Sequence, residues 1–315
     1  MGALHEWHLE ALTDIWTGDA ERRGDRLITT GLLGSIRWWF EVLVRGLRGS
    51  SCDPSVDDKT CLKQEHCVVC ELFGCTGWSR KFRFDVRNQQ GGIISSKLTK
   101  NTTFRLRFTP LRAVKDEEWA LIELTLRLIA EFGALGGKTV LKPSSQNDKP
   151  QHADFGLVKL MTAPTITHKR KQLASYVGEW SKKPIVKGAT WASCSHMWFV
   201  NGRYLTRQDA NTSTFNRIIG RPEPKNQSAQ GDSWLAGRRA QSPRNRGPAV
   251  EAESKKVFSF RQPPRTFGFV QETAELDAMR ERLRGVWRLP AAPTDWFLSG
   301  DALLTRLFST AGDAS

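Results

Sequence analysis

The chain has 315 residues, enough for two domains that each bury a hydrophobic core. Its 47 Lys and Arg residues exceed its 33 Asp and Glu residues, and the formal charge of +14 indicates a polyanionic partner. The composition excludes a collagen, a coiled coil and a fully disordered chain. No stretch approaches the ~20 apolar residues that cross a bilayer, and residues 1–20 lack the pattern of an export signal. We therefore expect a cytoplasmic protein with no membrane partner.

The first half of the chain predicts an alternation of strands and helices. Residues 3–13 partly alternate apolar and polar side chains, as in a strand with one face on a core. Residues 29–47 repeat apolar side chains at three- and four-residue steps, which predicts an amphipathic helix with Thr29 or Thr30 as its N-cap and Trp39 in its core stripe. Further strands are predicted at 81–86, 103–109 and 153–161, and a second helix at 116–132. The order is β-α-β-β-α-β, that of a ferredoxin-like unit in the α+β class.

The second half of the chain is less patterned. Residues 220–256 are rich in Pro, Gly, Ser, Asn, Gln and Arg and predict a long basic loop. Residues 257–271 predict a strand pair, and a helix follows from residue 274. We expect a second α+β domain interrupted by the basic loop, with domains at 1–161 and 162–315.

Five of the six cysteines fall within 24 residues, inside a Cys-rich loop at 50–75. In a reducing compartment such a group favours a metal over disulfides. The four candidate ligands of a structural zinc ion are Cys52, Cys61, Cys67 and Cys70. Four thiolates close the coordination tetrahedron and leave no position for a catalytic water. Two alternatives stay open, because Cys75 or His66 can replace Cys52 in the set, or the cysteines are simply buried thiols.

Three segments carry a resemblance to a known family: TTGLLGSIRWWFE (29–41), CVVCELFGCTGWSRKFRF (67–84) and FGALGGK (132–138). Together they resemble the RAMP superfamily of CRISPR effector subunits, and within it the first-subunit family of the Cmr module of type III-B complexes. The resemblance implies two ferredoxin-like (RRM-like) units in tandem, with a zinc-loop insertion in the first and the long basic loop in the second. It also implies a non-catalytic, antiviral RNA-binding subunit that holds guide and target RNA near the 3′ end of the crRNA. The implied partners are the crRNA, the target RNA and other RAMP subunits.

The glycines of the first motif suggest how RNA is held. Gly31 and Gly34 keep side chains off the start of the predicted helix, so that a phosphate can approach N–H groups without an intrahelical partner. The alternative is that both glycines only permit tight packing of the helix against the sheet. In FGALGGK, Lys138 stands where the family has an arginine, and a helix C-cap explains Gly133.

Phosphate contacts made by basic side chains position RNA without reading its sequence. The candidate RNA-binding residues are Gly31, Gly34, Arg37, Arg45, Arg80, Lys81, Arg83, Lys138, Arg238, Arg239, Arg244 and Arg246.

None of the six histidines falls in a catalytic pattern, and we expect no enzyme activity. The alternative function is a metal-dependent endoribonuclease that uses a loop aspartate. Asp19 and Asp25 occupy the comparable loop, beside arginines that favour ion pairing. A third hypothesis is a basic, zinc-stabilised protein that binds acidic proteins.

Overall fold

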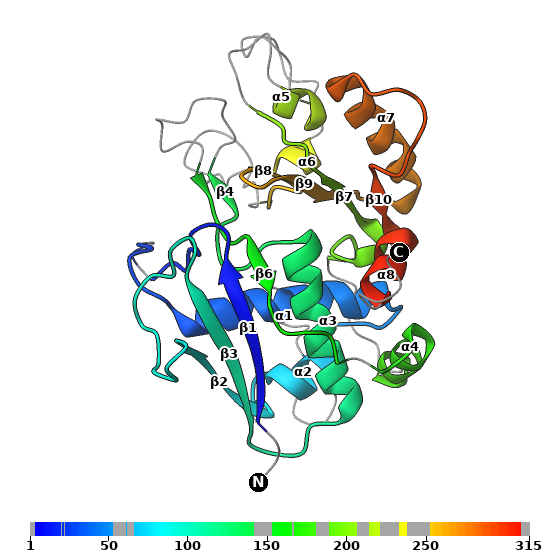
Figure 1. The fold of residues 1–315 in the computed structure, drawn as a ribbon. Helices are drawn as coiled ribbons and strands as arrows, with labels where there is room; N and C mark the ends of the chain where they lie inside the picture. Colours follow the sequence, from blue (N-terminus) through cyan, green and yellow to red (C-terminus); the bar gives the residue numbers. More distant parts are fainter. Residues whose placement is uncertain are drawn as a thin grey trace, which may run out of the picture. The chain divides into compact units, whose positions relative to one another are not determined.

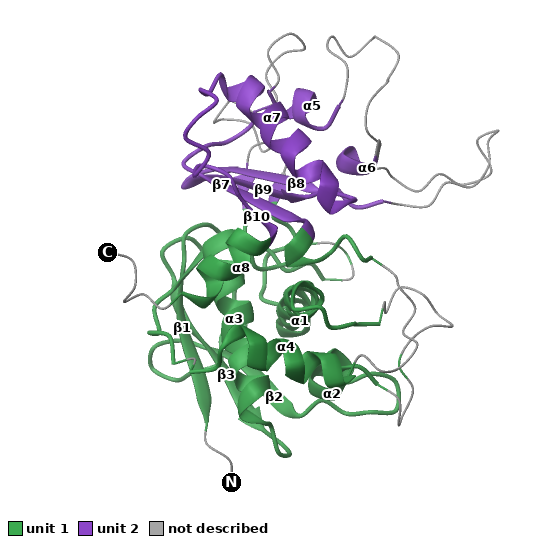
Figure 2. Ribbon diagram, turned by 90° about the vertical axis from the view of Figure 1, so that its right-hand side faces the viewer, with its two compact units in different colours: residues 1–139, 155–195, 301–315 green, residues 140–154, 196–300 purple. Residues whose placement is uncertain are grey.

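The computed structural model describes most of the chain. The described residues are 4–19, 21, 23–52, 61, 66–141, 153–165, 167–180, 189–206, 214–220, 233–237 and 253–309. They form two compact units (Figure 2). Unit 1 comprises residues 1–139, 155–195 and 301–315, and unit 2 comprises residues 140–154 and 196–300. The domain boundary between residues 161 and 162 stays a prediction.

Unit 1 contains a four-stranded antiparallel sheet. Its strands are β1 (His5–Ala11), β2 (Phe82–Arg87), β3 (Thr103–Pro110) and β6 (Val158–Leu160). They lie in the order β2-β3-β1-β6. The two long helices of the unit, α1 (Thr29–Gly46) and α3 (Asp116–Phe132), lie together behind this sheet in Figure 1. The predicted elements of the first half are present, with one exception. The strand predicted at 153–161 is divided, because β5 (Ala153–Asp154) pairs with β4 (Val140–Leu141) and only β6 joins this sheet.

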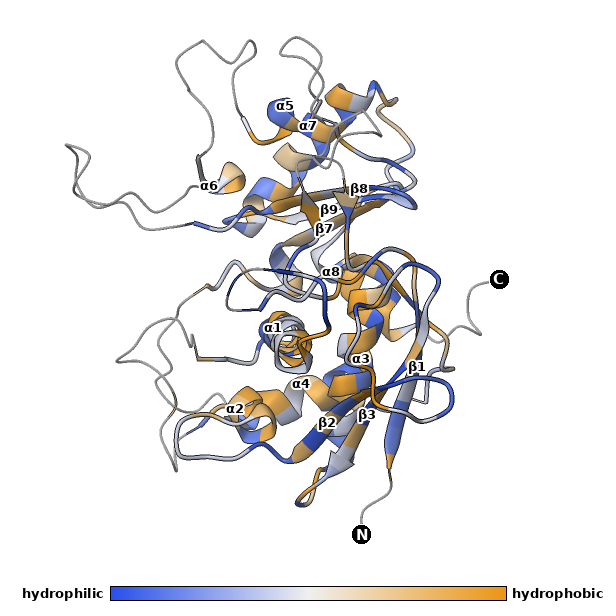
Figure 3. Cartoon of the chain, turned by 90° about the vertical axis from the view of Figure 1, so that its left-hand side faces the viewer, coloured by the Kyte–Doolittle hydropathy of each residue, from blue (hydrophilic) through white to orange (hydrophobic). Residues whose placement is uncertain are grey.

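Side-chain alternation explains why these strands form a sheet with one packed face. Along β3, Phe104, Leu106 and Phe108 are completely buried, whereas the residues between them are partly exposed. Alternate residues of a strand point to opposite faces, so one face packs against the helices and the other carries charge. Both hydrophobic and hydrophilic positions are visible along the ribbons of these strands in Figure 3.

The start of α1 differs from the prediction in one respect. The N-cap is Ile28, which offers no side-chain hydrogen bond, so neither Thr29 nor Thr30 caps the helix. Both threonines already belong to the helix. Trp39 lies in the core as predicted, with its indole N–H donating to the Ala134 carbonyl at 2.8 Å.

Unit 2 contains the second four-stranded antiparallel sheet. Its strands are β7 (Met197–Asn201), β8 (Val257–Arg261), β9 (Pro264–Phe269) and β10 (Leu298–Ser299), in the order β10-β7-β9-β8. The predicted strand pair is the hairpin β8-β9, and the predicted helix is α7 (Leu276–Trp287). Trp198 and Leu283 are completely buried in the core of this unit.

The two sheets share one arrangement. In each sheet, numbering the four strands in chain order, the spatial order is fourth-first-third-second. The remaining elements are α2 (Val68–Phe73), β4 (Val140–Leu141), β5 (Ala153–Asp154), α4 (Arg170–Glu179), α5 (Thr214–Ile218), α6 (Ser233–Ala236), α8 (Gly300–Phe308) and the short 3₁₀ helices 194–196 and 273–275. No helix within the described ranges has both the length and the apolar character needed to span a membrane.

Candidate metal centre and nucleic-acid interface

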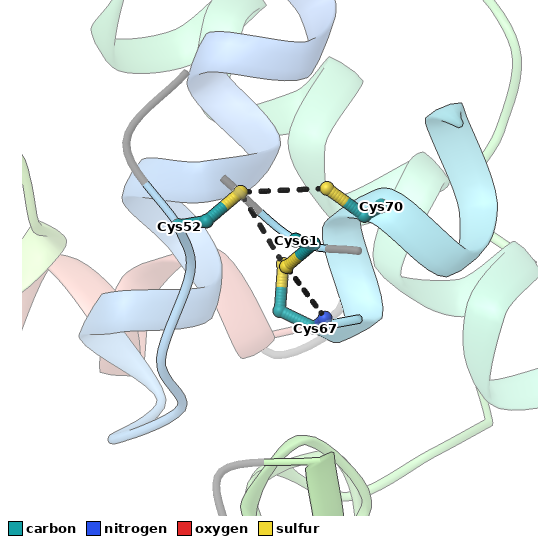
Figure 4. A group of neighbouring side chains, drawn as sticks. All are labelled: Cys52, Cys61, Cys67 and Cys70. Carbon is teal, nitrogen blue, oxygen red and sulfur yellow. Dashed lines mark hydrogen bonds between the residues drawn. The ribbon is translucent and has the colours of Figure 1, made fainter. Parts of the chain in front are cut away.

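The structure brings the four predicted cysteines together. The Sγ atoms of Cys52, Cys61, Cys67 and Cys70 all lie within 4.8 Å of one another, and all four residues are buried (Figure 4). Cys67 precedes α2 and Cys70 lies one turn into it, so the helix directs both thiols to one side. The Cys52 and Cys70 Sγ atoms are 3.4 Å apart, and those of Cys52 and Cys67 are 4.0 Å apart.

These separations are those of one tetrahedral site. A zinc ion with Zn–S bonds of about 2.3 Å places its sulfurs about 3.8 Å apart. Four buried sulfur donors are a set that Zn²⁺ prefers in structural sites. The donor set therefore fits the predicted metal.

The two alternative ligands have other surroundings. His66 Nε2 contacts a Glu71 carboxylate oxygen, and the His66 ring lies 4.6 Å from the Trp78 ring. Cys75 is half-buried and stands outside the group of four. The compact group is thus the predicted set, Cys52 included.

Arg37 supplies positive charge beside this cluster. Its guanidinium donates to Cys70 Sγ at 3.3 Å and to the Gly74 carbonyl at 2.8 Å, and it pairs with Glu41 at 3.3 Å. Burial opposes the charge, but Cys70 and Glu41 outweigh it and raise the pKa of Arg37. Arg45 also turns inward, donating to the Ala192 carbonyl at 3.0 Å and pairing with Glu41 at 3.6 Å.

Lys81 lies inside a buried ionic network. Its ammonium is 2.8 Å from Glu118 and 2.7 Å from Glu71, and only 7% of its side chain is exposed. Glu118 is completely buried and also accepts a hydrogen bond from the Tyr176 hydroxyl at 3.0 Å. The sequence pattern predicts that Lys81 contacts RNA, but the side chain points into the protein, where the buried carboxylate of Glu118 needs a cation.

The N-terminus of α1 is open. The helix has no side-chain cap and no acidic residue in its first turn. Gly31 and Gly34 are both exposed; a Cβ added at Gly34 meets no atom within 4 Å, and one at Gly31 makes only ordinary contacts from 3.7 Å. Tight packing therefore does not explain the glycines, and that alternative is wrong.

The third sequence motif joins the first at this place. The Gly136 N–H donates to Ser35 Oγ at 2.9 Å, which ties the loop after α3 to α1. Lys138 is exposed, with its ammonium 4.1 Å from the centre of the Trp16 ring. Trp16 was not singled out from the sequence, because no local pattern shows that glycines distant along the chain approach its ring.

Gly133 is the C-cap of α3, as predicted, and it has a second role. Its backbone is extended, with φ −121° and ψ −152°, so it is not a left-handed C-cap. A Cβ at this position comes within 2.5 Å of the Trp39 ring. Close approach of the two segments, rather than backbone conformation, requires glycine here.

The other predicted RNA contacts are placed as follows. Arg83 is exposed on β2 and pairs with Asp85 at 3.2 Å, and Arg80 is half-buried just before this strand. The remaining candidates lie outside the described residues: Arg238, Arg239, Arg244 and Arg246. RNA binding by each candidate stays a prediction.

The two aspartates of the nuclease alternative have different surroundings. Asp19 pairs with Arg23 at 3.1 Å and Arg26 at 3.8 Å, and the Arg23 backbone N–H and side chain lower the pKa of its carboxyl. Asp25 is exposed. Across the described ranges, the cysteine cluster is the one group of three or more Cys, His, Asp or Glu ligands close enough to share a metal.

Comparison with protein families gives one match, to the RAMP superfamily over residues 8–141. Residues 8–141 belong to the RAMP superfamily. This region contains α1, the four clustered cysteines and Lys138. No curated protein sequence matches the chain.

Three solved structures are similar to the chain at low identity. Cmr1 from Pyrococcus furiosus is 12% identical, with 98% of each chain covered and a TM-score of 0.41. A chain of the type III-B Cmr-beta complex bound to cognate target RNA is 10% identical over 90% of this chain and 99% of that one, with a TM-score of 0.48. A chain of the Csm3-Csm4 subcomplex of a type III-A complex is 18% identical over 50% of this chain and 74% of that one, with a TM-score of 0.28.

Proposed function

We propose that the chain is a non-catalytic, RNA-binding subunit of a type III CRISPR effector complex of the Cmr type. It holds guide and target RNA near the 3′ end of the crRNA, beside other RAMP subunits. The RAMP match over residues 8–141 and the formal charge of +14 support this function. The repeated strand order supports two ferredoxin-like units in tandem.

The observation that carries the proposal is the open N-terminus of α1. Backbone N–H groups at a helix N-terminus attract a phosphate, and Gly31 and Gly34 leave room for it. Lys138 adds an exposed ammonium on a loop that is bonded to the same helix. These three residues form what we call the α1 phosphate site.

The remaining basic candidates divide by their surroundings. Arg83 is exposed and can add a phosphate contact. Arg37, Arg45 and Lys81 have carboxylate or carbonyl partners inside the fold, and we assign them to stability. The four clustered cysteines would hold a structural zinc ion, whose binding supplies folding energy to the Cys-rich loop.

An RNA-binding assay tests this function. The purified chain is mixed with end-labelled single-stranded RNA over a salt series, with Mg²⁺ or EDTA, and analysed on native and denaturing gels. We expect a shift that weakens steeply with salt, because phosphate binding releases counterions, and intact RNA on both gels. Cleavage that requires Mg²⁺ and disappears in Asp25→Ala contradicts the proposal in favour of a nuclease. No shift at physiological salt favours a protein-binding function instead.

A further inference from the structure

A cavity in unit 1, remote in sequence from the cysteine cluster, has no part in the proposed RNA contacts. It has a volume of about 220 Å³ and lies between the start of β1, the start of α3 and the segment around residue 167. β1 and α3 begin at the same end of the unit (Figure 1). Its lining residues are His5, Trp7, Asp116, Trp119, Ala120 and Glu123, with Thr165, Thr167 and His168.

Aromatic rings form one wall of the cavity. The His5 and Trp119 rings are stacked, with centroids 3.8 Å apart and planes 17° from parallel. The Trp7 ring lies 6.2 Å from Trp119. Trp119 is half-buried, so part of its surface is accessible. Such rings offer a flat surface on which a planar cation stacks.

Two carboxylates give the cavity a negative character within a basic protein. Glu123 is buried, and it accepts hydrogen bonds from the Thr165 backbone N–H at 2.7 Å and from the Thr165 hydroxyl. Asp116 is exposed at the first position of α3. Because both carboxylates line the cavity, a phosphate backbone is disfavoured here and a cation is favoured.

The edge of β1 beside the cavity has no partner strand over part of its length. The His8 carbonyl accepts from the Met161 N–H at 2.8 Å, and the His8 N–H donates to Thr162 Oγ1 at 2.7 Å. Backbone groups of alternate residues point to the same edge, so the N–H and C=O of Glu6 point there too. Pairing with β6 covers only Leu9–Ala11, and no described residue pairs with Glu6 on this edge.

The same edge is flanked by exposed apolar side chains. Leu4, before β1, and Met161, after β6, are each 51% exposed. An unpaired edge with apolar ends is the surface to which an extended peptide adds as a further strand. Alternate side chains of that peptide point to the face that carries His5 and Trp7, and therefore reach the cavity.

We propose that this edge and cavity bind an extended segment of a partner protein, with an arginine side chain of the segment in the cavity. The guanidinium stacks on Trp119 and pairs with Asp116, while the peptide backbone pairs with Glu6. Arginine fits better than lysine because its group is planar and donates in two parallel directions. The site is separate from the α1 phosphate site and does not rest on RNA binding.

The test uses a pentapeptide with a central arginine between valine and threonine residues, titrated into the full chain labelled with ¹⁵N at tryptophan. The indole N–H resonance that Trp119→Phe removes reports on the cavity. We expect the peptide to shift it, and a matched peptide with citrulline, which has the shape of arginine without its charge, to bind about tenfold more weakly. The arginine peptide methylated at its backbone nitrogens should also bind about tenfold more weakly, because it cannot donate the backbone hydrogen bonds of a paired strand.

Two variants distinguish a specific contact in the cavity from a general effect of negative charge. Asp116→Asn should weaken the arginine peptide by about tenfold, whereas Glu117→Gln, which changes a neighbouring carboxylate outside the cavity lining, should leave binding unchanged. Unchanged dispersion of the other resonances shows that both variants are folded. Equal binding of the citrulline peptide, or no effect of Asp116→Asn, overturns the proposal. So does an oligouridylate that shifts the Trp119 resonance at lower concentration than the peptide, since the cavity is then a nucleobase site.

Discussion

The basic residues predicted to hold RNA occupy two opposite surroundings. Arg37 and Lys81 are engaged inside unit 1, one beside the cysteine cluster and the other between two carboxylates. Lys138 and Arg83 are exposed, at the α1 phosphate site and on β2. All four were predicted from the sequence to contact RNA, because each is a basic residue in or beside a motif or strand. A basic residue therefore remains a candidate RNA contact only where the folded chain leaves it exposed, as it does for Arg83 in spite of its pair with Asp85.

The largest expected effect concerns the cysteine cluster, to which Arg37 donates a hydrogen bond. We expect one zinc per chain, measured by mass spectrometry of the purified protein. Cys67→Ser should lose the metal and much of its contribution to folding, which is of order 10 kcal/mol for structural zinc. Cys75→Ser is the control, because Cys75 lies outside the cluster and should retain the metal. Equal loss in both variants contradicts the assigned set.

The second prediction compares a buried cation, Lys81, with an exposed cation two residues later, Arg83. Lys81→Met leaves the carboxylate of Glu118 buried without its cation and should reduce the free energy of unfolding by about 3–5 kcal/mol. Arg83→Met breaks only an exposed pair and should change it by about 1 kcal/mol or less. Urea unfolding of both variants measures the difference. Similar values for the two would show that Lys81 is not held as described.

The third prediction concerns RNA binding, for which an exposed cation should matter although it contributes little to stability. Lys138→Gln should leave the unfolding free energy nearly unchanged, since Lys138 is exposed and its contact with Trp16 is worth only about 0.5–1 kcal/mol. It should reduce the salt dependence of RNA binding by about one phosphate contact. The measurement is the slope of log affinity against log salt. Lys159→Gln, on β6, is a matched exposed control, and an equal change in its slope would mean that the effect is general charge.

Local sequence patterns predicted much of unit 1. The helix at 116–132 was predicted at its observed bounds, and the four cysteines of the cluster were chosen from spacing alone. Both depend on periodicity or short spacing, which a single sequence displays. In unit 2 only the hairpin and α7 were predicted, because β7 and β10 are short and pair across a long sequence separation.

Features that depend on contacts between distant segments were missed. Lys81 alternates with aromatic residues as an exposed cation does, and nothing near it in sequence reveals Glu118, 37 residues away. Gly133 ends α3 as predicted, but the sequence does not reveal that the ring of Trp39 requires glycine there. In both cases the partner is set by tertiary packing, which overrides the local pattern.

The central claim is that backbone near the start of α1 meets a phosphate, and Gly34→Ala tests it most directly. Gly285→Ala is the matched control, because it also lies within a helix and its added Cβ meets nothing within 4 Å. Both variants should gain about 0.5–1 kcal/mol of unfolding free energy, since glycine is unfavourable inside a helix. RNA affinity at one fixed salt concentration should fall several-fold in Gly34→Ala alone. Equal RNA affinity of the two variants and the unmodified chain would contradict the α1 phosphate site.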